Sequence, residues 1–293
     1  MKDPNSIHTA DSKSYGLADI VDAIPPLPFI VTFVLELTDK DDLSAVALAH
    51  AVEADPGLTA RILRVSNSAF YSPVERVYTV RDAINYIGFE TVRSLTVTNT
   101  IVKGLWVEDE TFSKQMFWRH SLRCGLFAKT LAHAIQLRSP DILFTLGVLH
   151  DIGRAAIIQQ DPKLYHKALD VMHDEVIELW QAEKKVLGYD HAEIGGVLAQ
   201  KWGLPPVYAN VIACHHEPGQ TTDYKVLAHV IQLADALAHS VSPKDRIGII
   251  TPPLVEQLWH PLGLSEQAIR KIYQEREVIE LHTKSLFETA SLD

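Results

Sequence analysis

The residues best suited to chemistry in this sequence are a histidine and two aspartates placed in apolar segments. His150 and Asp151 are adjacent and follow the apolar stretch 144–148, and Asp235 lies within the apolar stretch 231–237. A charged carboxylate in such surroundings is costly unless an ion pair or a metal ion neutralises it. We therefore interpret both aspartates as candidate ligands of a metal ion.

Four further histidines lie in apolar helical patterns or at their ends: His120, His191, His215 and His216. Together these residues give two candidate metal sets. The first set is His120, His150, Asp151 and Asp235, and the second is His191, His215 and His216 with Asp151 as a bridge. Imidazole and carboxylate ligands suit iron, manganese or zinc better than calcium, so a divalent metal, as one ion or two, is the expected cofactor. Two ions about 3.5–4 Å apart would fit hydrolysis of a phosphoester.

A purely structural interpretation stands beside the metal one. A single histidine in a helix usually packs or caps, and ligands this scattered lack the compact spacing of a zinc finger. The pair His215 and His216 could also interact with the dipole at a helix end. Six other histidines are interpreted as ordinary packed or surface residues: His50, His133, His166, His173, His229 and His239.

Hydrophobic periodicity predicts helices along almost the whole chain, so the predicted fold class is all-α. In the first part, Asp55 is a predicted N-cap with Pro56 at the first helical position, Thr79 is a second N-cap, and Gly88 ends a helix. The predicted helices of this part are 29–37, 43–54, 56–66, 79–87 and 89–102, with a loop at 67–77. Those of the second part are 112–137, 141–159, 165–187, 191–202, 207–215, 223–240, 253–262 and 265–290. At most 246–250 is a short extended piece.

The acidic segment 108–110 marks a weak boundary. This boundary divides the chain into an N-terminal helical subdomain at 16–107 and a larger helical domain at 108–293. The polar residues 1–15 predict a loosely held tail before them. A length of 293 residues is compatible with one large domain or with two of ordinary size.

The composition excludes several classes of protein. The 27 Lys and Arg residues against 37 Asp and Glu give a net charge of −10, which disfavours general binding to nucleic acid. The two cysteines, Cys124 and Cys214, lie in apolar helical patterns and predict no disulfide framework. No signal peptide and no run of 18 apolar residues is visible. We therefore expect a cytoplasmic protein that does not bind membranes.

Two blocks of sequence resemble the HDOD family, a branch of the HD superfamily. The first is Pro25-Pro26-Leu27-Pro28 followed by the segment from Asp55-Pro56-Gly57 to Ser66-Asn67-Ser68-Ala69. The second is Leu149-His150-Asp151-Ile152-Gly153 with His191-Ala192-Glu193, Trp202-Gly203-Leu204-Pro205 and His215-His216-Glu217-Pro218. The first block is specific to HDOD proteins, and the second is shared with HD-GYP phosphodiesterases. The resemblance covers roughly residues 20 to 240.

The resemblance implies an all-helical fold, with an HD-like domain and an additional N-terminal helical subdomain. It also implies a bacterial signalling role, often without proven enzymatic activity. Many HDOD members have lost metal ligands. In this sequence seven residues match ligand positions of the HD-GYP relatives: His120, His150, Asp151, His191, His215, His216 and Asp235.

Three departures from the HD-GYP pattern put hydrolysis of cyclic di-GMP in doubt. Arg154 stands where those enzymes have lysine, and the Gly-Tyr-Pro loop after His-His-Glu is absent. Arginine can hold a phosphate in a bidentate manner, but it does not donate a proton near neutral pH. Met116 stands where relatives with three metals carry glutamate, so at most two ions are expected.

Three functions remain open at this point. The first is a regulatory module that senses a metal, a nucleotide or a partner and passes its state to a separate signalling protein. The second is a metal-dependent phosphohydrolase or phosphodiesterase acting on a nucleotide, a cyclic dinucleotide or another phosphate, with Asp151 and Arg154 as catalytic residues. The third is a redox or oxygen sensor with two iron ions. Enzymatic activity, the identity of the ligand and the oligomeric state are left open.

Overall fold

The computed structural model describes residues 16–27, 29–37, 42–68, 70–104, 109, 112–137, 140–241 and 256–290. Within these ranges the regular elements are helices, and no strand occurs, so the all-α prediction is confirmed. The predicted tail 1–15, the extended piece 246–250 and most of the boundary 108–110 lie outside the described residues.

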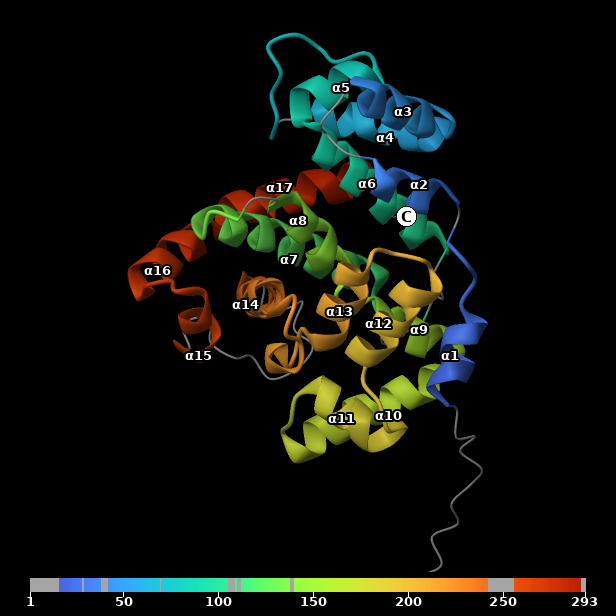
Figure 1. Ribbon diagram of the computed structural model, residues 1–293, viewed down its shortest axis with the longest axis vertical. Coiled ribbons are helices and arrows are strands. Elements are labelled where there is room, and N and C mark those ends of the chain that lie inside the picture. Colours follow the sequence, from blue (N-terminus) through green and yellow to red (C-terminus); the bar gives the residue numbers. More distant parts are fainter. Residues whose placement is uncertain are drawn as a thin grey trace, which may run out of the picture.

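Six helices form the first part of the chain: α1 (Leu17–Ala23), α2 (Phe29–Glu36), α3 (Asp42–Glu53), α4 (Pro56–Ser66), α5 (Val80–Ile87) and α6 (Phe89–Gly104). Helices α3, α4 and α5 pack on one another at the top of Figure 1, and α6 leads from them to α8. Helix α1 packs apart from this group, against α9 and α12.

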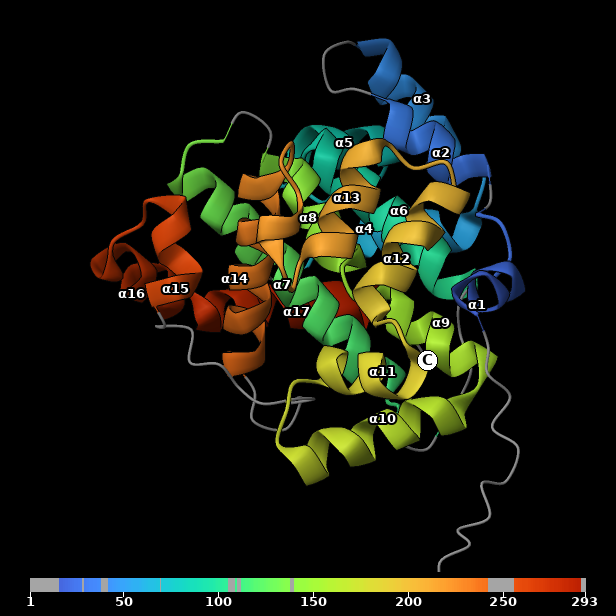
Figure 2. The same ribbon diagram turned by 60° about the horizontal axis from the view of Figure 1, so that its bottom comes forward.

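The second part contains α7 (Lys114–Ala134), α8 (Pro140–Leu149), α9 (Ile152–Gln160), α10 (Pro162–Glu175), α11 (Leu179–Leu187), α12 (His191–Lys201), α13 (Pro206–Cys214) and α14 (Lys225–Val241). After α13 comes the 3-10 turn η1 (Pro218–Gln220), and α15 (Glu256–Trp259), η3 (His260–Leu262), α16 (Glu266–Gln274) and α17 (Arg276–Ala290) follow α14. Helices α7 and α8 lie at the centre, and α14 packs on α7. Figure 2 shows α10 and α11 side by side at the base.

The helix starts read from the sequence are confirmed. Asp55 accepts hydrogen bonds from the backbone N–H groups of Gly57 at 2.8 Å and Leu58 at 3.1 Å, with Pro56 as the first helical residue. Thr79 accepts one from the Asp82 N–H at 3.0 Å. These side chains satisfy backbone donors that have no partner inside the helix.

Three of the predicted long helices are each two helices, so their continuity was predicted wrongly. The predicted helix 141–159 breaks between α8 and α9, at His150 and Asp151. The predicted helix 165–187 breaks between α10 and α11, where Val176 takes a φ of 53°. The predicted helix 265–290 breaks between α16 and α17. None of the three breaks contains a glycine or proline. Apolar periodicity continues across these breaks because the helices on both sides bury an apolar face.

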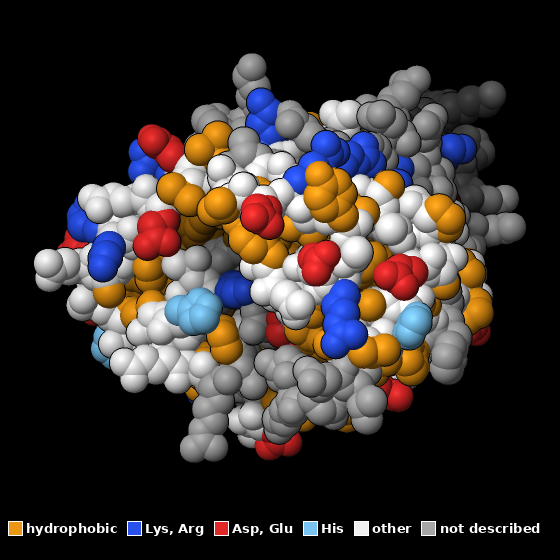
Figure 3. Space-filling view, turned by 90° about the horizontal axis from the view of Figure 1, so that it is seen from above, with side chains coloured by type: hydrophobic (Ala, Val, Ile, Leu, Met, Phe, Trp, Pro, Cys, Tyr) orange, Lys and Arg blue, Asp and Glu red, His pale blue; other side chains and the backbone are white. Residues whose placement is uncertain are grey.

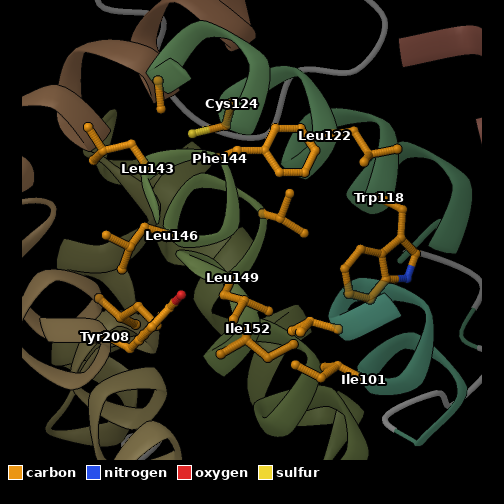
Figure 4. Packing of buried hydrophobic residues seen from close by; sticks show 14 of the residues in the cluster. Ile101, Trp118, Leu122, Cys124, Leu143, Phe144, Leu146, Leu149, Ile152 and Tyr208 are labelled. Atoms are coloured by element: carbon orange, nitrogen blue, oxygen red, sulfur yellow. The ribbon is translucent and has the colours of Figure 1, made fainter. Parts of the chain in front are cut away.

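The centre of the molecule is a continuous apolar core around α7 and α8. Figure 4 shows Leu122 and Cys124 of α7 with Phe144 and Leu146 of α8 in this core. The two helices approach closely at a pair of glycines, since a Cβ atom added to Gly147 would lie 2.7 Å from the backbone nitrogen of Gly125. Only glycine, which has no side chain, allows two helix backbones to come this close.

The stretch Ile142–Gln160, which includes α8 and α9, is long and apolar enough to cross a membrane by length and composition. However, 89% of that window is buried inside the protein. Its hydrophobicity is therefore accounted for by its place in the core.

A second close approach joins the starts of α9 and α12. A Cβ atom added to Gly153 would lie 2.0 Å from the carbonyl oxygen of His191. This contact is between backbone atoms, so it cannot be relieved by a change of side-chain conformation. It sets the N-terminus of α12 beside Asp151, which immediately precedes α9.

We predict that Gly153→Ala lowers the free energy of unfolding by about 3 kcal/mol, because α9 and α12 must move apart. The measurement is urea unfolding followed by circular dichroism. Gly219→Ala is the matched control, because a Cβ atom there meets nothing within 4 Å and φ is not positive. Equal stability of the two variants would contradict the prediction.

Candidate metal centre

The structure brings all seven predicted ligands to one place from five separate segments. His120 comes from the middle of α7 and Asp235 from α14. The break after α8 supplies His150 and Asp151, and the start of α12 supplies His191. His215 and His216 follow directly after α13. The break between α8 and α9 matters here, because it lets both His150 and Asp151 face the same point.

The first ligand group is His120, His150 and Asp235, whose candidate ligand atoms all lie within 4.8 Å of one another. The Oδ1 atom of Asp235 lies 2.9 Å from Nε2 of His120 and 3.5 Å from Nε2 of His150. The His120 and His150 side chains are at most 4% exposed, and that of Asp235 is 18% exposed.

The second ligand group is His191, His215 and His216, whose candidate ligand atoms also lie within 4.8 Å of one another. The Nε2 atoms of His191 and His216 are only 2.8 Å apart. Two neutral imidazole nitrogens can sit this close only when one carries a proton or when both lone pairs point at a cation. Trp180 stacks on His216 with ring centroids 5.5 Å apart, and this contact holds the ring in place.

Asp151 lies between the two groups. Its Oδ1 atom is 3.1 Å from Nε2 of His191 and 3.4 Å from Nε2 of His150, and its Oδ2 atom is 3.9 Å from Nε2 of His120. His150, Asp151 and His215 also form a third combination that could hold a metal ion. A carboxylate in this position could bridge two cations.

Three of the imidazoles are oriented by hydrogen bonds at their other nitrogen. Nδ1 of His150 donates to the Gly147 carbonyl at 2.7 Å, and Nδ1 of His215 donates to the Ile212 carbonyl at 2.7 Å. Nδ1 of His191 donates to Oε2 of Glu183 at 2.6 Å. Metal-binding histidines show this arrangement because it fixes the tautomer that leaves Nε2 as a ligand.

Several buried polar atoms of these residues have no hydrogen-bond partner. They are both ring nitrogens of His120, Nε2 of His150, Nε2 of His215 and Oδ1 of Asp235. Buried polar atoms are almost always satisfied in proteins, and exceptions call for an explanation such as an ion. The Nε2 atoms and the carboxylate oxygen among them converge on one another, so the residues present fit a divalent cation.

The electrostatics of the site favour the ligand forms of several of these groups. Burial disfavours the charge of Asp151, yet His150 and Arg154 outweigh it and hold its pKa well below the usual range. Burial, with nearby imidazoles, lowers the pKa of His215 to about 4 and that of His216 well below its usual value. Metal ligands must be ionised carboxylates and neutral imidazoles, as these three groups are.

Arg154 lies in a different setting from the one expected for a phosphate ligand. It is 4% exposed, and its guanidinium donates to Oδ2 of Asp151 at 2.6 Å and to the hydroxyl of Tyr165 at 2.9 Å. The rings of Phe112 and Phe117 lie 5.8 and 5.9 Å from it. In the structure, therefore, Arg154 contacts Oδ2 of Asp151, whereas Oδ1 is the oxygen closer to His191 and His150.

Two residues at the site were not singled out from the sequence. Glu183 of α11 has a fully buried side chain and also accepts the backbone N–H of His191 at 2.9 Å. His239, interpreted above as an ordinary residue, has Nε2 3.3 Å from Oδ1 of Asp235 and its ring 4.2 Å from that of His120. The spacing of four residues between Asp235 and His239 on one helix was a usable signal. Glu183 carried no such signal, because its partner is on another helix.

We predict that Glu183→Gln weakens metal binding about 10- to 100-fold, because the amide orients His191 less strongly than the carboxylate does. The measurement is competition for the metal against a chelator of known affinity. Glu175→Gln serves as the control, since that carboxylate lies nearby in the chain but is paired with Lys185 at the surface. Unchanged affinity in Glu183→Gln would contradict a role for Glu183 at this centre.

Known structures share this fold over almost its whole length. An HDOD domain protein of unknown function from Geobacter sulfurreducens is 22% identical, with a TM-score of 0.78 over 92% of this chain and 97% of that one. A proposed phosphohydrolase from Shewanella amazonensis SB2B is 27% identical, with a TM-score of 0.74 over 94% of this chain and 99% of that one.

An uncharacterised protein of Treponema pallidum is 25% identical over 223 residues, which is 75% of this chain. The aligned part is 43% of that relative's length. The model of the HDOD domain matches residues 24–218, and this span includes six of the seven predicted ligands. Asp235 lies beyond its end. The chain therefore belongs to the HDOD family.

Proposed function

We propose that this protein is a signal-transduction protein of the HDOD family whose regulatory state depends on a two-metal centre. The observation that carries the proposal is the set of buried imidazole and carboxylate atoms that lack partners and converge around Asp151. Burying so many polar atoms without a cation would cost free energy at each of them. Iron or manganese suits this ligand set best, and zinc also fits it.

The regulatory role is favoured over a catalytic one by the position of Arg154. A phosphohydrolase needs positively charged groups that face the substrate phosphate. The guanidinium of Arg154 is instead committed to Asp151 and Tyr165 inside the core. We therefore assign Arg154 the task of positioning Asp151. In this view, metal occupancy sets how the five ligand-bearing segments pack, and a separate signalling partner recognises that packing.

A second candidate is a metal-dependent phosphohydrolase, and the position of Asp151 between the two ligand groups favours it. The likeness to a proposed phosphohydrolase points the same way. Two bound cations would supply Lewis acidity and a lowered pKa for water at the site. The chain's own residues would hold the cations through Asp151 and keep that carboxylate ionised through Arg154.

We predict that the protein purified without chelator contains about two divalent ions per chain, as measured by elemental analysis. Asp235→Asn should remove the ion of the first group, and His216→Ala that of the second, leaving about one ion in each variant. Asp151→Asn should lose both. His133→Ala is the control, because this exposed histidine of α7 lies away from the seven ligands. A metal-free wild type under these conditions would overturn the proposal.

Turnover separates the two candidate functions. With manganese or iron bound, we expect no hydrolysis of bis(p-nitrophenyl) phosphate or of a cyclic dinucleotide above the rate of a metal-free sample. Hydrolysis that falls at least about 100-fold in Asp151→Asn, and is retained in His133→Ala, would instead establish the phosphohydrolase. Metal content is measured on the same samples, so that a missing cofactor is not mistaken for a missing activity.

A further inference from the structure

A cavity apart from the metal centre lies where three parts of the chain meet. Its volume is about 270 Å³. Its lining comes from the loop after α4, from α6, from α7 and α8, and from the C-terminal helix α17. Figure 3, which looks down on the N-terminal helices, shows a hollow on this face with hydrophobic side chains at its border and a basic side chain inside it.

The inner wall of the cavity is apolar. Leu126, Phe144, Ile279 and Leu286 line it, and each is at most 7% exposed. At the mouth, Phe70 and Val278 are 37% and 56% exposed, which is high for large apolar side chains. An apolar hollow with exposed apolar residues at its edge is the usual form of a small-molecule site.

The mouth also carries an ordered aromatic group. The ring of Phe70 stacks on that of His282 with centroids 3.6 Å apart and planes 13° apart, and the Tyr71 hydroxyl lies 3.1 Å from Nε2 of His282. Burial and then the charge of Lys129 lower the pKa of His282 to about 4. His282 is thus neutral near pH 7, and the ammonium group of Lys129 lies near it.

The polar side of the cavity is formed mainly by α7, where Lys129 and His133 are one turn apart. Two carboxylates also line the cavity, those of Glu90 and Glu275. Glu90 is paired with Arg93 of its own helix, so its negative charge is largely balanced. Lys129 therefore places a positive charge on the side formed by α7, next to the apolar interior, and Glu275 places a negative charge between α16 and α17.

We propose that this cavity binds a small apolar molecule with one carboxylate group. Its apolar part would lie against Leu126, Phe144 and Ile279, and its carboxylate would lie at Lys129. A cavity of about 150 Å³ holds benzene, so this one suits about ten to twelve non-hydrogen atoms. Because the ligand would contact both α7 and α17, it would bridge the helix that carries His120 and the C-terminal helix.

The test uses decanoate below its micellar concentration, with the full chain in its metal-replete form and isothermal titration calorimetry. We expect one saturable site in the wild type. Val278→Trp should weaken binding at least about tenfold by filling the mouth. Leu281→Trp is the matched control, because Leu281 lies on the same helix and is 65% exposed but does not line the cavity. This control should bind within about twofold of the wild type.

The charge of the ligand is tested separately with decanol and decylamine. Lys129→Met should weaken the binding of decanoate about tenfold and leave the binding of decanol unchanged, because only the carboxylate makes a charge-assisted contact.

Val278→Phe replaces Val278→Trp if the larger side chain disturbs folding, as judged by circular dichroism. A decanoate molecule bound at the metal centre instead would be insensitive to the changes at residues 278 and 129.

Three results would overturn the proposal. They are the absence of saturable decanoate binding, equal effects of the tryptophan substitutions at 278 and 281, and tighter binding of decylamine than of decanoate. None of them bears on the metal content of the protein, so this proposal and that for the metal centre fail independently.

Discussion

The cost of burying Asp151 is the constraint on which the rest of the structure depends. This carboxylate is 4% exposed, with its Oδ1 atom next to the imidazole of His191 and its Oδ2 atom paired with the guanidinium of Arg154. A buried charge is tolerated only when it is paired and hydrogen-bonded, and removing one partner is strongly destabilising. The imidazoles have the same requirement, because several of their nitrogens have no hydrogen-bond partner of proper geometry. A cation between them meets both requirements at once.

The backbone around the centre is arranged to serve this constraint. The break between α8 and α9 turns His150 and Asp151 toward one point, and Gly153 lets α12 approach until His191 reaches Asp151. Glu183 then holds His191 from the far side. Together they fix the ligand atoms before any ion arrives, which reduces the free energy lost in ordering them.

Helix α7 connects the metal centre with the C-terminal helix. Arg119 and Arg123, which lie on either side of His120 in the sequence, both donate to the carboxylate of Glu280 on α17. The Arg123 side chain is fully buried, so this ion pair holds α17 firmly against α7. Farther along the same two helices lies the apolar cavity. A change in the packing of α7 would therefore reach α17, which offers a physical route by which a bound metal or ligand could alter a surface seen by a partner.

The sequence by itself determined the helical fold, the helix starts at Asp55 and Thr79 and the seven residues that converge. These follow from local rules: apolar periodicity, capping side chains, and the cost of aspartate in apolar stretches. Only the tertiary structure decided where the long helices break, that Arg154 turns inward, and that Glu183 joins the site. These outcomes depend on contacts between residues of different helices or on which way a side chain turns in the packed core. Periodicity along one helix carries no information about either, because an apolar face continues whether the backbone bends or not.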